Sequence, residues 1–180
     1  MWHSDDFLKA LALAGEAHAS QKIPGLERPY LEHVIGVTME ALRAALTDES
    51  LNYNLIICCG LLHDVVEDTS VSLTTIEEQF GTQVAQGVAA LTKNGALPKE
   101  KRMEDSLARI LALGLPEIRI IKMADRCDNL RKPPPHWTRE KILAYYNEAH
   151  YILNTLRGVN RAIEDRLEER IQQYEQYCRN

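Results

Sequence analysis

The sequence lacks the features of several common protein classes. No apolar run approaches the roughly 20 residues that a helix needs to cross a bilayer. Its first 15 residues carry acids where a signal peptide would need bases, so we predict a first helix there and a cytoplasmic protein. The four cysteines form no CxxC pair, which is typical of reduced, mostly buried thiols and disfavours a thiolate nucleophile. No P-loop and no GxGxxG motif is present.

The sequence also lacks an alternating strand pattern of useful length, a repeat and an interdomain linker. Its 180 residues, 45% hydrophobic and 26% charged, are typical of one globular domain spanning 1–180. We predict an all-α bundle of about seven to nine helices, with an apolar and central helix at 54–68. The remaining helices are expected from about residue 5 to before 22, over 30–46, 72–80, 83–91, 100–113, 116–130 and 138–156, and from 158 onward.

Basic residues are missing from positions 44–92, which hold seven acids and carry a charge of −7. Positions 93–141 carry +5, so a stretch suited to a cation precedes one suited to an anion. This pairing favours a metal-bound phosphate ester as ligand. The overall charge of −5 argues against a binder of duplex DNA or RNA, which would normally be basic.

Four polar residues interrupt an apolar run in GLLHDVVEDT, residues 60–69. They are His63, Asp64, Glu67 and Asp68. On a helix, 64 and 68 share one face, where like charges repel by about 0.2–0.5 kcal/mol. The apolar neighbours would desolvate the carboxylates, and the segment offers no cationic side chain. A polar patch at a helix end is the simpler alternative, but a bound metal ion best explains so many uncompensated acids.

A catalytic metal site needs further histidine or aspartate ligands from other helices. The best candidates to join His63 and Asp64 are His33, in PYLEHVIGV, and Asp125, in IRIIKMADRCDNL. Taken alone, His33 could be a core histidine and Asp125 an ion-pair partner of a neighbouring base. Together the four side chains would neutralise a divalent ion and leave about two of six positions open. Such nitrogen and oxygen donors favour Mn²⁺, with Fe²⁺, Co²⁺ or Zn²⁺ as alternatives.

These motifs carry a family resemblance. The H…HD…D pattern resembles the HD-domain metal phosphohydrolases, and HDVVEDT with ADRxxN resembles the hydrolase domain of the RelA/SpoT alarmone enzymes. The segment from HWTREKILAYY onward is similar to stand-alone small alarmone hydrolases, including the metazoan SpoT homologue. The similarity runs from about residue 5 to 175, and a synthetase domain would not fit in 180 residues.

The resemblance implies removal of the 3′-pyrophosphate from guanosine 3′,5′-bispyrophosphates by Mn²⁺ and a water nucleophile. It also implies roles for individual residues: metal ligands His33, His63, Asp64 and Asp125; water-activating acids Glu67 and Asp68; and substrate contacts Lys22, Asn129, Lys141 and Tyr145. Alternatives are adenine alarmones, the 2′-phosphate of NADPH, or a non-catalytic nucleotide-binding module. The expected partner is a small nucleotide, and no membrane association is expected. The sequence does not indicate the oligomeric state.

The sequence departs from the family pattern where the base is expected to bind. The loop after the first helix reads Gln21-Lys22-Ile23-Pro24, so Lys22 remains but Ile23 replaces a second basic residue. Asp128 replaces a common His or Tyr before Asn129. The ligand chemistry is unaffected, but we expect relaxed selectivity between guanine and adenine.

Overall fold

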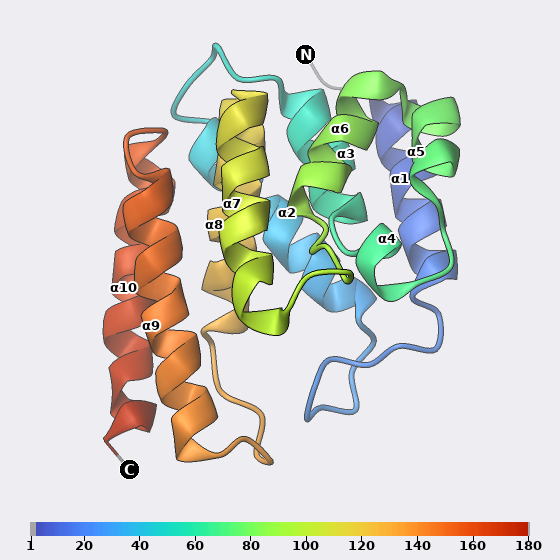
Figure 1. Cartoon of the computed structure of the whole chain (residues 1–180). Coiled ribbons are helices and arrows are strands. Elements are labelled where there is room, and N and C mark those ends of the chain that lie inside the picture. Colours follow the sequence, from blue (N-terminus) through green and yellow to red (C-terminus); the bar gives the residue numbers. More distant parts are fainter. Residues whose placement is uncertain (1–2, 180) are drawn as a thin grey trace.

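The computed structural model describes residues 3–179, which form helices and, within that range, no β-strand beyond an isolated bridge between Lys22 and Pro29. The helices are α1 (Ser4–Ala17), α2 (Leu31–Ala45), α3 (Tyr53–Leu62), α4 (Val65–Asp68), α5 (Leu73–Phe80), α6 (Thr82–Leu91), the 3₁₀ helix η1 (Lys99–Lys101), α7 (Arg102–Leu113), α8 (Pro116–Asn129), α9 (Arg139–Leu156) and α10 (Arg161–Cys178). The expected all-α fold is confirmed (Figure 1). No helix in the described range is long and apolar enough to cross a membrane.

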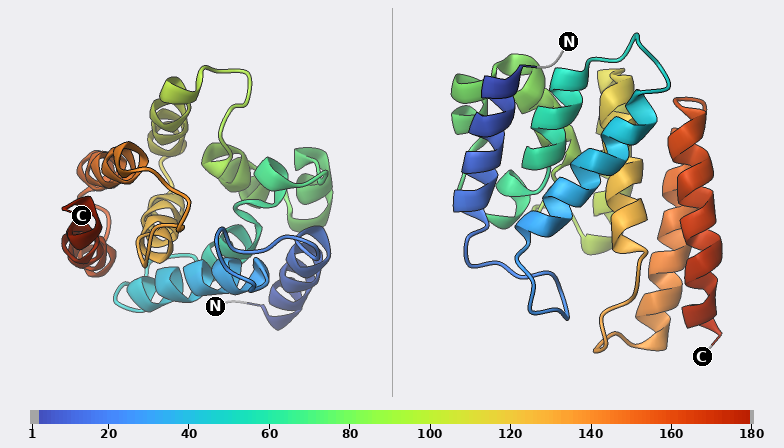
Figure 2. Two further views of the ribbon diagram at one scale, coloured as in Figure 1. Left: turned by 90° about the horizontal axis from the view of Figure 1, so that it is seen from below. Right: turned by 180° about the vertical axis from the view of Figure 1, so that it is seen from behind.

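Helix α3 lies at the centre of the bundle and contacts α1, α2, α6 and α8. Its residues are apolar on nearly every side and almost all of them are buried, as the sequence predicts. Helix α2 crosses α3 and α8 on the back of the molecule (Figure 2). Gly60 allows the two helices to cross closely, since a Cβ atom at that position would lie only 2.7 Å from Oγ1 of Thr38. The close packing of α2 on α3 brings together the segments that carry His33 and His63.

One expected helix is interrupted. The sequence predicted a continuous helix over 54–68, but α3 ends at Leu62 and α4 is a separate four-residue turn. His63 and Asp64 form the break, with Asp64 at φ −104° and ψ −5°. If α4 is counted with α3, nine α-helices remain among the described residues, within the expected number. The break places the His-Asp pair at the end of the buried helix.

Two loops lie next to each other at one end of the molecule. The loop after α1 contains Gly25, whose φ is +79°, and a Cβ there would lie 2.8 Å from Cδ of Pro135. Pro135 belongs to the connector 131–137, which is extended as its three consecutive prolines predict. Helix α9 then begins after Thr138, whose side chain accepts a hydrogen bond from Lys141 N. Helices α9 and α10 pack side by side at the C-terminal edge (Figures 1 and 2).

Candidate metal centre

Two imidazoles face each other at the crossing of α2 and α3. Nδ1 of His63 lies 2.8 Å from the carbonyl oxygen of Gly60, and Nδ1 of His33 lies 2.8 Å from Oδ2 of Asp128. A carbonyl or carboxylate oxygen can only accept, so both Nδ1 atoms carry the proton. Each Nε2 is buried and has no hydrogen-bond partner among the described residues. Two unpartnered, buried imidazole nitrogens are what a metal site requires.

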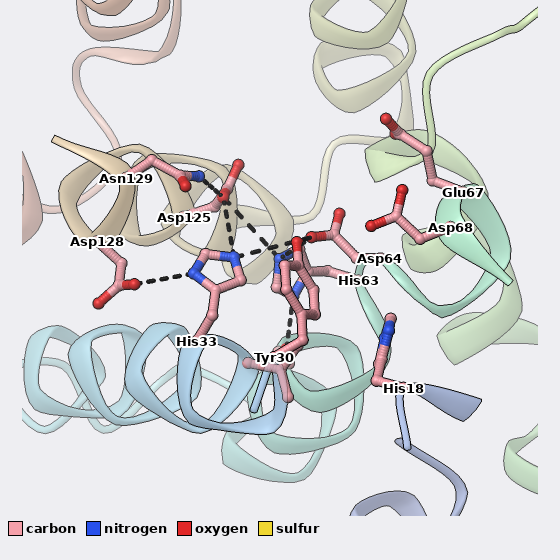
Figure 3. A network of polar contacts seen from close by, with 12 residues as sticks. His18, Tyr30, His33, His63, Asp64, Glu67, Asp68, Asp125, Asp128 and Asn129 are labelled. Carbon is pink, nitrogen blue, oxygen red and sulfur yellow. Dashed lines mark hydrogen bonds and ion pairs between the residues drawn. The ribbon is translucent and has the colours of Figure 1, made fainter. Parts of the chain in front are cut away.

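Two carboxylates complete the cluster. Asp64 Oδ2 lies 3.1 Å from His63 Nε2 and 3.7 Å from His33 Nε2. Asp125 Oδ1 lies 3.6 Å and 3.9 Å from Nε2 of His33 and His63. His33, His63 and Asp64 each place one donor atom within 4.8 Å of the other two (Figure 3). Asp125 joins this group because its Oδ1 lies close to the Nε2 atoms of both histidines. The four donors fit a divalent cation in number, charge and chemical type.

The electrostatics of the cluster favour a cation. Burial alone would lower the pKa of His33, but its hydrogen bond to Asp128 and the nearby carboxylates of Asp64 and Asp125 outweigh burial and raise the pKa to about 10. Burial would raise the pKa of Asp125, yet Lys122 and His63 hold it at about 2. Without a metal, the imidazoles must therefore retain protons to balance the carboxylates. A divalent ion can take the place of those protons.

A polar cavity of about 230 Å³ opens beside the cluster. Its lining includes acids from the −7 stretch and bases from the +5 stretch of the sequence. The acids are Asp64, Glu67 and Asp68, and the bases are Lys93, Lys122 and Arg126. The two oppositely charged stretches thus meet at one site, where both a cation and an anion can be bound.

A second, more apolar cavity of about 280 Å³ adjoins the first. The two share Tyr30, Asn129 and Tyr145 in their walls. The apolar cavity lies between the loop after α1 and the triproline connector, and its lining includes Ile23, Pro24, Pro133, Pro134, Pro135 and Trp137. The shared residues place the two cavities side by side.

Comparison with known proteins shows the family. A family model described as HD domain matches residues 10–160. This protein belongs to the HD-domain family. Guanosine-3′,5′-bis(diphosphate) 3′-pyrophosphohydrolase MESH1 of Drosophila melanogaster is 34% identical over 172 residues, covering 92% of this chain and 93% of that protein. The Homo sapiens protein of the same name is 31% identical over 173 residues, covering 92% and 93%.

A solved structure gives the same result for the fold. It is described as a metazoan ortholog of SpoT that hydrolyses ppGpp, and it has a TM-score of 0.82 with 30% identity. The match covers 96% of this chain and 97% of that chain. The resemblance to the RelA/SpoT-type HD hydrolases that the motifs indicated is confirmed.

Other side chains of this HD-domain protein hold the candidate ligands in place. Tyr30 donates a 2.5 Å hydrogen bond to Asp64 Oδ2. Asp125 accepts at Oδ2 from Lys122 Nζ, at 3.1 Å, and at Oδ1 from Asn129 Nδ2, at 2.6 Å. Sequence reasoning missed Tyr30 as a supporting residue, although its place one turn before His33 was a usable signal. It assigned Asn129 to the substrate, whereas in the structure its amide is bound to Asp125 and also borders both cavities.

One acid of the −7 stretch, Glu67, has a cationic partner from outside the stretch. This corrects the expectation from the sequence that these acids lack a compensating cation. Glu67 accepts two hydrogen bonds from Lys93, from Nζ at 2.9 Å and from the backbone N at 2.8 Å. Lys93 is the first residue beyond the stretch and lies 26 positions from Glu67. Asp68 instead accepts from Gln21 Nε2 and is more exposed. Desolvation raises the pKa of Asp68, and the charges of Asp64 and Glu67 raise it further.

The remaining predicted contacts lie at different distances from the cavities. Tyr145 borders both of them, and its ring centroid lies 3.9 Å from the guanidinium of Arg126. Lys141 is exposed, with Nζ 4.3 Å from the ring centroid of Trp137, at the edge of the apolar cavity. Lys22 is not among the residues that line either cavity, and it is ion-paired with Glu27. The structure therefore does not bring Lys22 to the site.

Proposed function

We propose that this HD-domain protein hydrolyses the 3′-pyrophosphate of guanosine 3′,5′-bispyrophosphates and releases GDP or GTP and pyrophosphate. The polar cavity carries the proposal, because Asp64 and Asp125 of the metal-type donor set line one space with further acids and three bases. The imidazoles of His33 and His63 lie next to these two carboxylates. The apolar cavity next to it is suited to a nucleobase. The activity named for the Drosophila and human relatives supports the same reaction.

His33, His63, Asp64 and Asp125 would hold the metal, and their nitrogen and oxygen donors without thiolate fit Mn²⁺. Such an ion, when bound, acidifies water and so supplies a nucleophile near neutral pH. Tyr30, Asp128 and Asn129 each donate to or accept from one ligand and fix its orientation.

Glu67 and Asp68 orient the attacking water and remove its proton. Glu67 is bound by the ammonium of Lys93, whereas Asp68 is bound only by a neutral amide, and desolvation and the charges of Asp64 and Glu67 raise the pKa of Asp68. Asp68 therefore accepts the proton. The water oxygen bonds to the phosphorus next to the ribose 3′-oxygen, the bond between that phosphorus and the 3′-oxygen breaks, and the 3′-oxygen takes up a proton.

The walls of the apolar cavity support a second substrate class, the adenine alarmones. The side chains of Ile23, Pro24 and the three prolines 133–135 have no hydrogen-bond donor or acceptor. A guanine-selective site would satisfy O6, N1 and N2 with fixed partners, because an unpaired buried polar group costs about 1–3 kcal/mol. A purine that packs against these five residues is selected there by shape alone, so both guanine and adenine fit.

A panel of purified nucleotides tests the function. ppGpp, ppApp and NADPH are incubated with the protein and Mn²⁺, and the products are separated by chromatography. We expect pyrophosphate and the matching 5′-diphosphate from the first two. The control is His63→Ala, which removes a candidate ligand and should release neither product. If wild-type protein leaves all three nucleotides intact, the chain is a non-catalytic nucleotide-binding module.

A further inference from the structure

Gln21 is held by its backbone at the junction between α1 and α2. Its N–H donates to the carbonyl of His18 at 3.0 Å, and its own carbonyl accepts from the N–H of Tyr30 at 2.9 Å. One neighbour closes the end of α1, and the other lies directly before α2 and contacts Asp64. The Gln21 side chain therefore starts from a fixed position beside the candidate metal centre.

The side chain of Gln21 joins two residues that lie far apart in the sequence. Nε2 donates to Asp68 Oδ2 at 2.9 Å, and Oε1 lies 2.6 Å from Nδ1 of His18. A carboxylate can only accept, so the amide nitrogen must face Asp68 and the amide oxygen must face His18. His18 Nδ1 then carries the proton and donates it. The reverse orientation would bring two oxygens together.

His18 is well placed to fix this orientation. Its side chain is 2% exposed, and its ring centroid lies 4.9 Å from that of Tyr30. Figure 3 shows His18 apart from the four candidate ligands, on the side of the cluster where Asp68 lies. A buried, packed ring has little freedom to turn, so the direction of its Nδ1–H bond is set by the fold.

Asp68 needs such a partner. It ends the four-residue helix α4, is exposed, and is repelled by the neighbouring carboxylates of Asp64 and Glu67. Without a hydrogen bond its carboxylate would turn toward solvent. A neutral amide holds one oxygen without cancelling the charge, unlike the ammonium that binds Glu67.

We propose that Gln21 is a positioning residue for the hydrolysis proposed above: it holds Oδ2 of Asp68 so that Oδ1 faces the reacting water, and His18 fixes the orientation of its amide. The inference rests on the proposed function, because it acts through Asp68 as the base.

A double-mutant cycle between Gln21 and Asp68 tests the inference. Gln21→Met keeps the length of the side chain and removes both hydrogen bonds. We expect kcat to fall about ten- to a hundredfold, the loss typical of a misplaced catalytic group, with KM and Mn²⁺ affinity unchanged. In Asp68→Asn protein the same replacement should change the residual kcat by less than about twofold, because the group that Gln21 positions is already inactive. Gln86→Met, on the exposed surface of α6, is the matched control.

A purely structural role for Gln21 predicts a different pattern. It would lower the melting temperature and reduce kcat by the same factor with or without Asp68, and that additive result would overturn the inference. His18→Phe provides a second route if Gln21→Met does not fold, since it keeps a ring beside Tyr30 and removes only the donor. We expect a smaller loss of kcat than for Gln21→Met, again absent in the Asp68→Asn background. Full activity of Asp68→Asn alone would instead overturn the assignment of the base, and the inference with it.

Discussion

The imidazole of His33 and the carboxylate of Asp128 are joined by a 2.8 Å hydrogen bond that links α2 to α8 at the candidate metal centre. Asp128 also pairs with Arg131, whose Nη2 lies 2.6 Å from its other oxygen. The residue that departs from the family pattern in the sequence is therefore a partner of a candidate metal ligand. A carboxylate behind a ligating histidine fixes the ring and increases its basicity.

We expect Asp128→Ala to lower the affinity for Mn²⁺ by about 10- to 100-fold, the usual effect of losing a partner of this kind. Asp128→Asn should have a smaller effect, because its amide oxygen can still accept from Nδ1. Equilibrium dialysis with Mn²⁺ measures both. Asp105→Ala, which removes a partner of Arg109 on α7, is the control. Unchanged affinity in Asp128→Ala would show that His33 does not need this contact to bind metal.

The acids Glu67 and Asp68 should separate catalysis from metal binding. Glu67→Gln and Asp68→Asn keep size and polarity, so the double variant should retain Mn²⁺ while kcat falls by about 10²–10⁴-fold, the typical loss of a general base. Steady-state kinetics and dialysis on the same sample give both quantities. Glu78→Gln replaces an exposed acid of the same stretch and serves as the control. Normal turnover by the double variant would make the pair structural.

Metal binding should release protons. The pKa of His33, raised to about 10, lies above its ordinary value near 6.5. In metal-free protein its proton therefore adds stability that is complete below about pH 6.5 and is lost as the pH rises toward 10. Metal needs the neutral ring, so its affinity should fall as the pH is lowered.

Calorimetry in two buffers of different ionisation enthalpy measures this release. At pH 7 we expect about one proton from His33 for each ion bound, with a further contribution from His63, whose pKa is also raised. Replacement of His136, which is exposed and lies outside the cluster, should leave the number unchanged. Binding without proton release would mean that neither imidazole is a ligand.

Base selectivity should be weak. We expect ppGpp and ppApp to be cleaved with kcat/KM values within about tenfold of each other, a difference of about 1.4 kcal/mol. Competition between the two nucleotides in one reaction measures the ratio directly. Ile23→Arg, which restores a basic residue at the wall of the apolar cavity, should shift the ratio toward ppGpp, since a guanidinium can donate to O6 of guanine. A hundredfold preference for guanine in the wild type would show that other residues read the base.

The fold and the candidate ligands could be predicted because each has a signal within a short segment of the sequence. Helical periodicity is local, and His33, His63 and Asp125 stand out as polar residues inside apolar helical segments. The break at His63-Asp64 left no such mark, since no glycine or proline signals it.

The partners of the acids could not be predicted, because they depend on tertiary packing. Lys93 and Glu67 lie 26 positions apart, and Gln21 and Asp68 lie 47 apart. For Lys22, in contrast, closeness in sequence was misleading. It directly precedes Ile23 and Pro24, which line the apolar cavity, but its own side chain is paired with Glu27. The direction in which a loop side chain points depends on tertiary contacts, and the hydrophobic periodicity of the sequence does not describe them.

The contact between Gly25 and Pro135 affects how a nucleotide would enter and leave. Proline rings fix φ along the connector, and the position where Gly25 would carry a Cβ is already occupied by Pro135. Because the loop after α1 and the connector pack against each other here, both are ordered before a ligand binds, and binding should cost little conformational entropy of the chain. The apolar cavity is thus preformed between the two loops, and a nucleotide bound there would meet walls that are already in place.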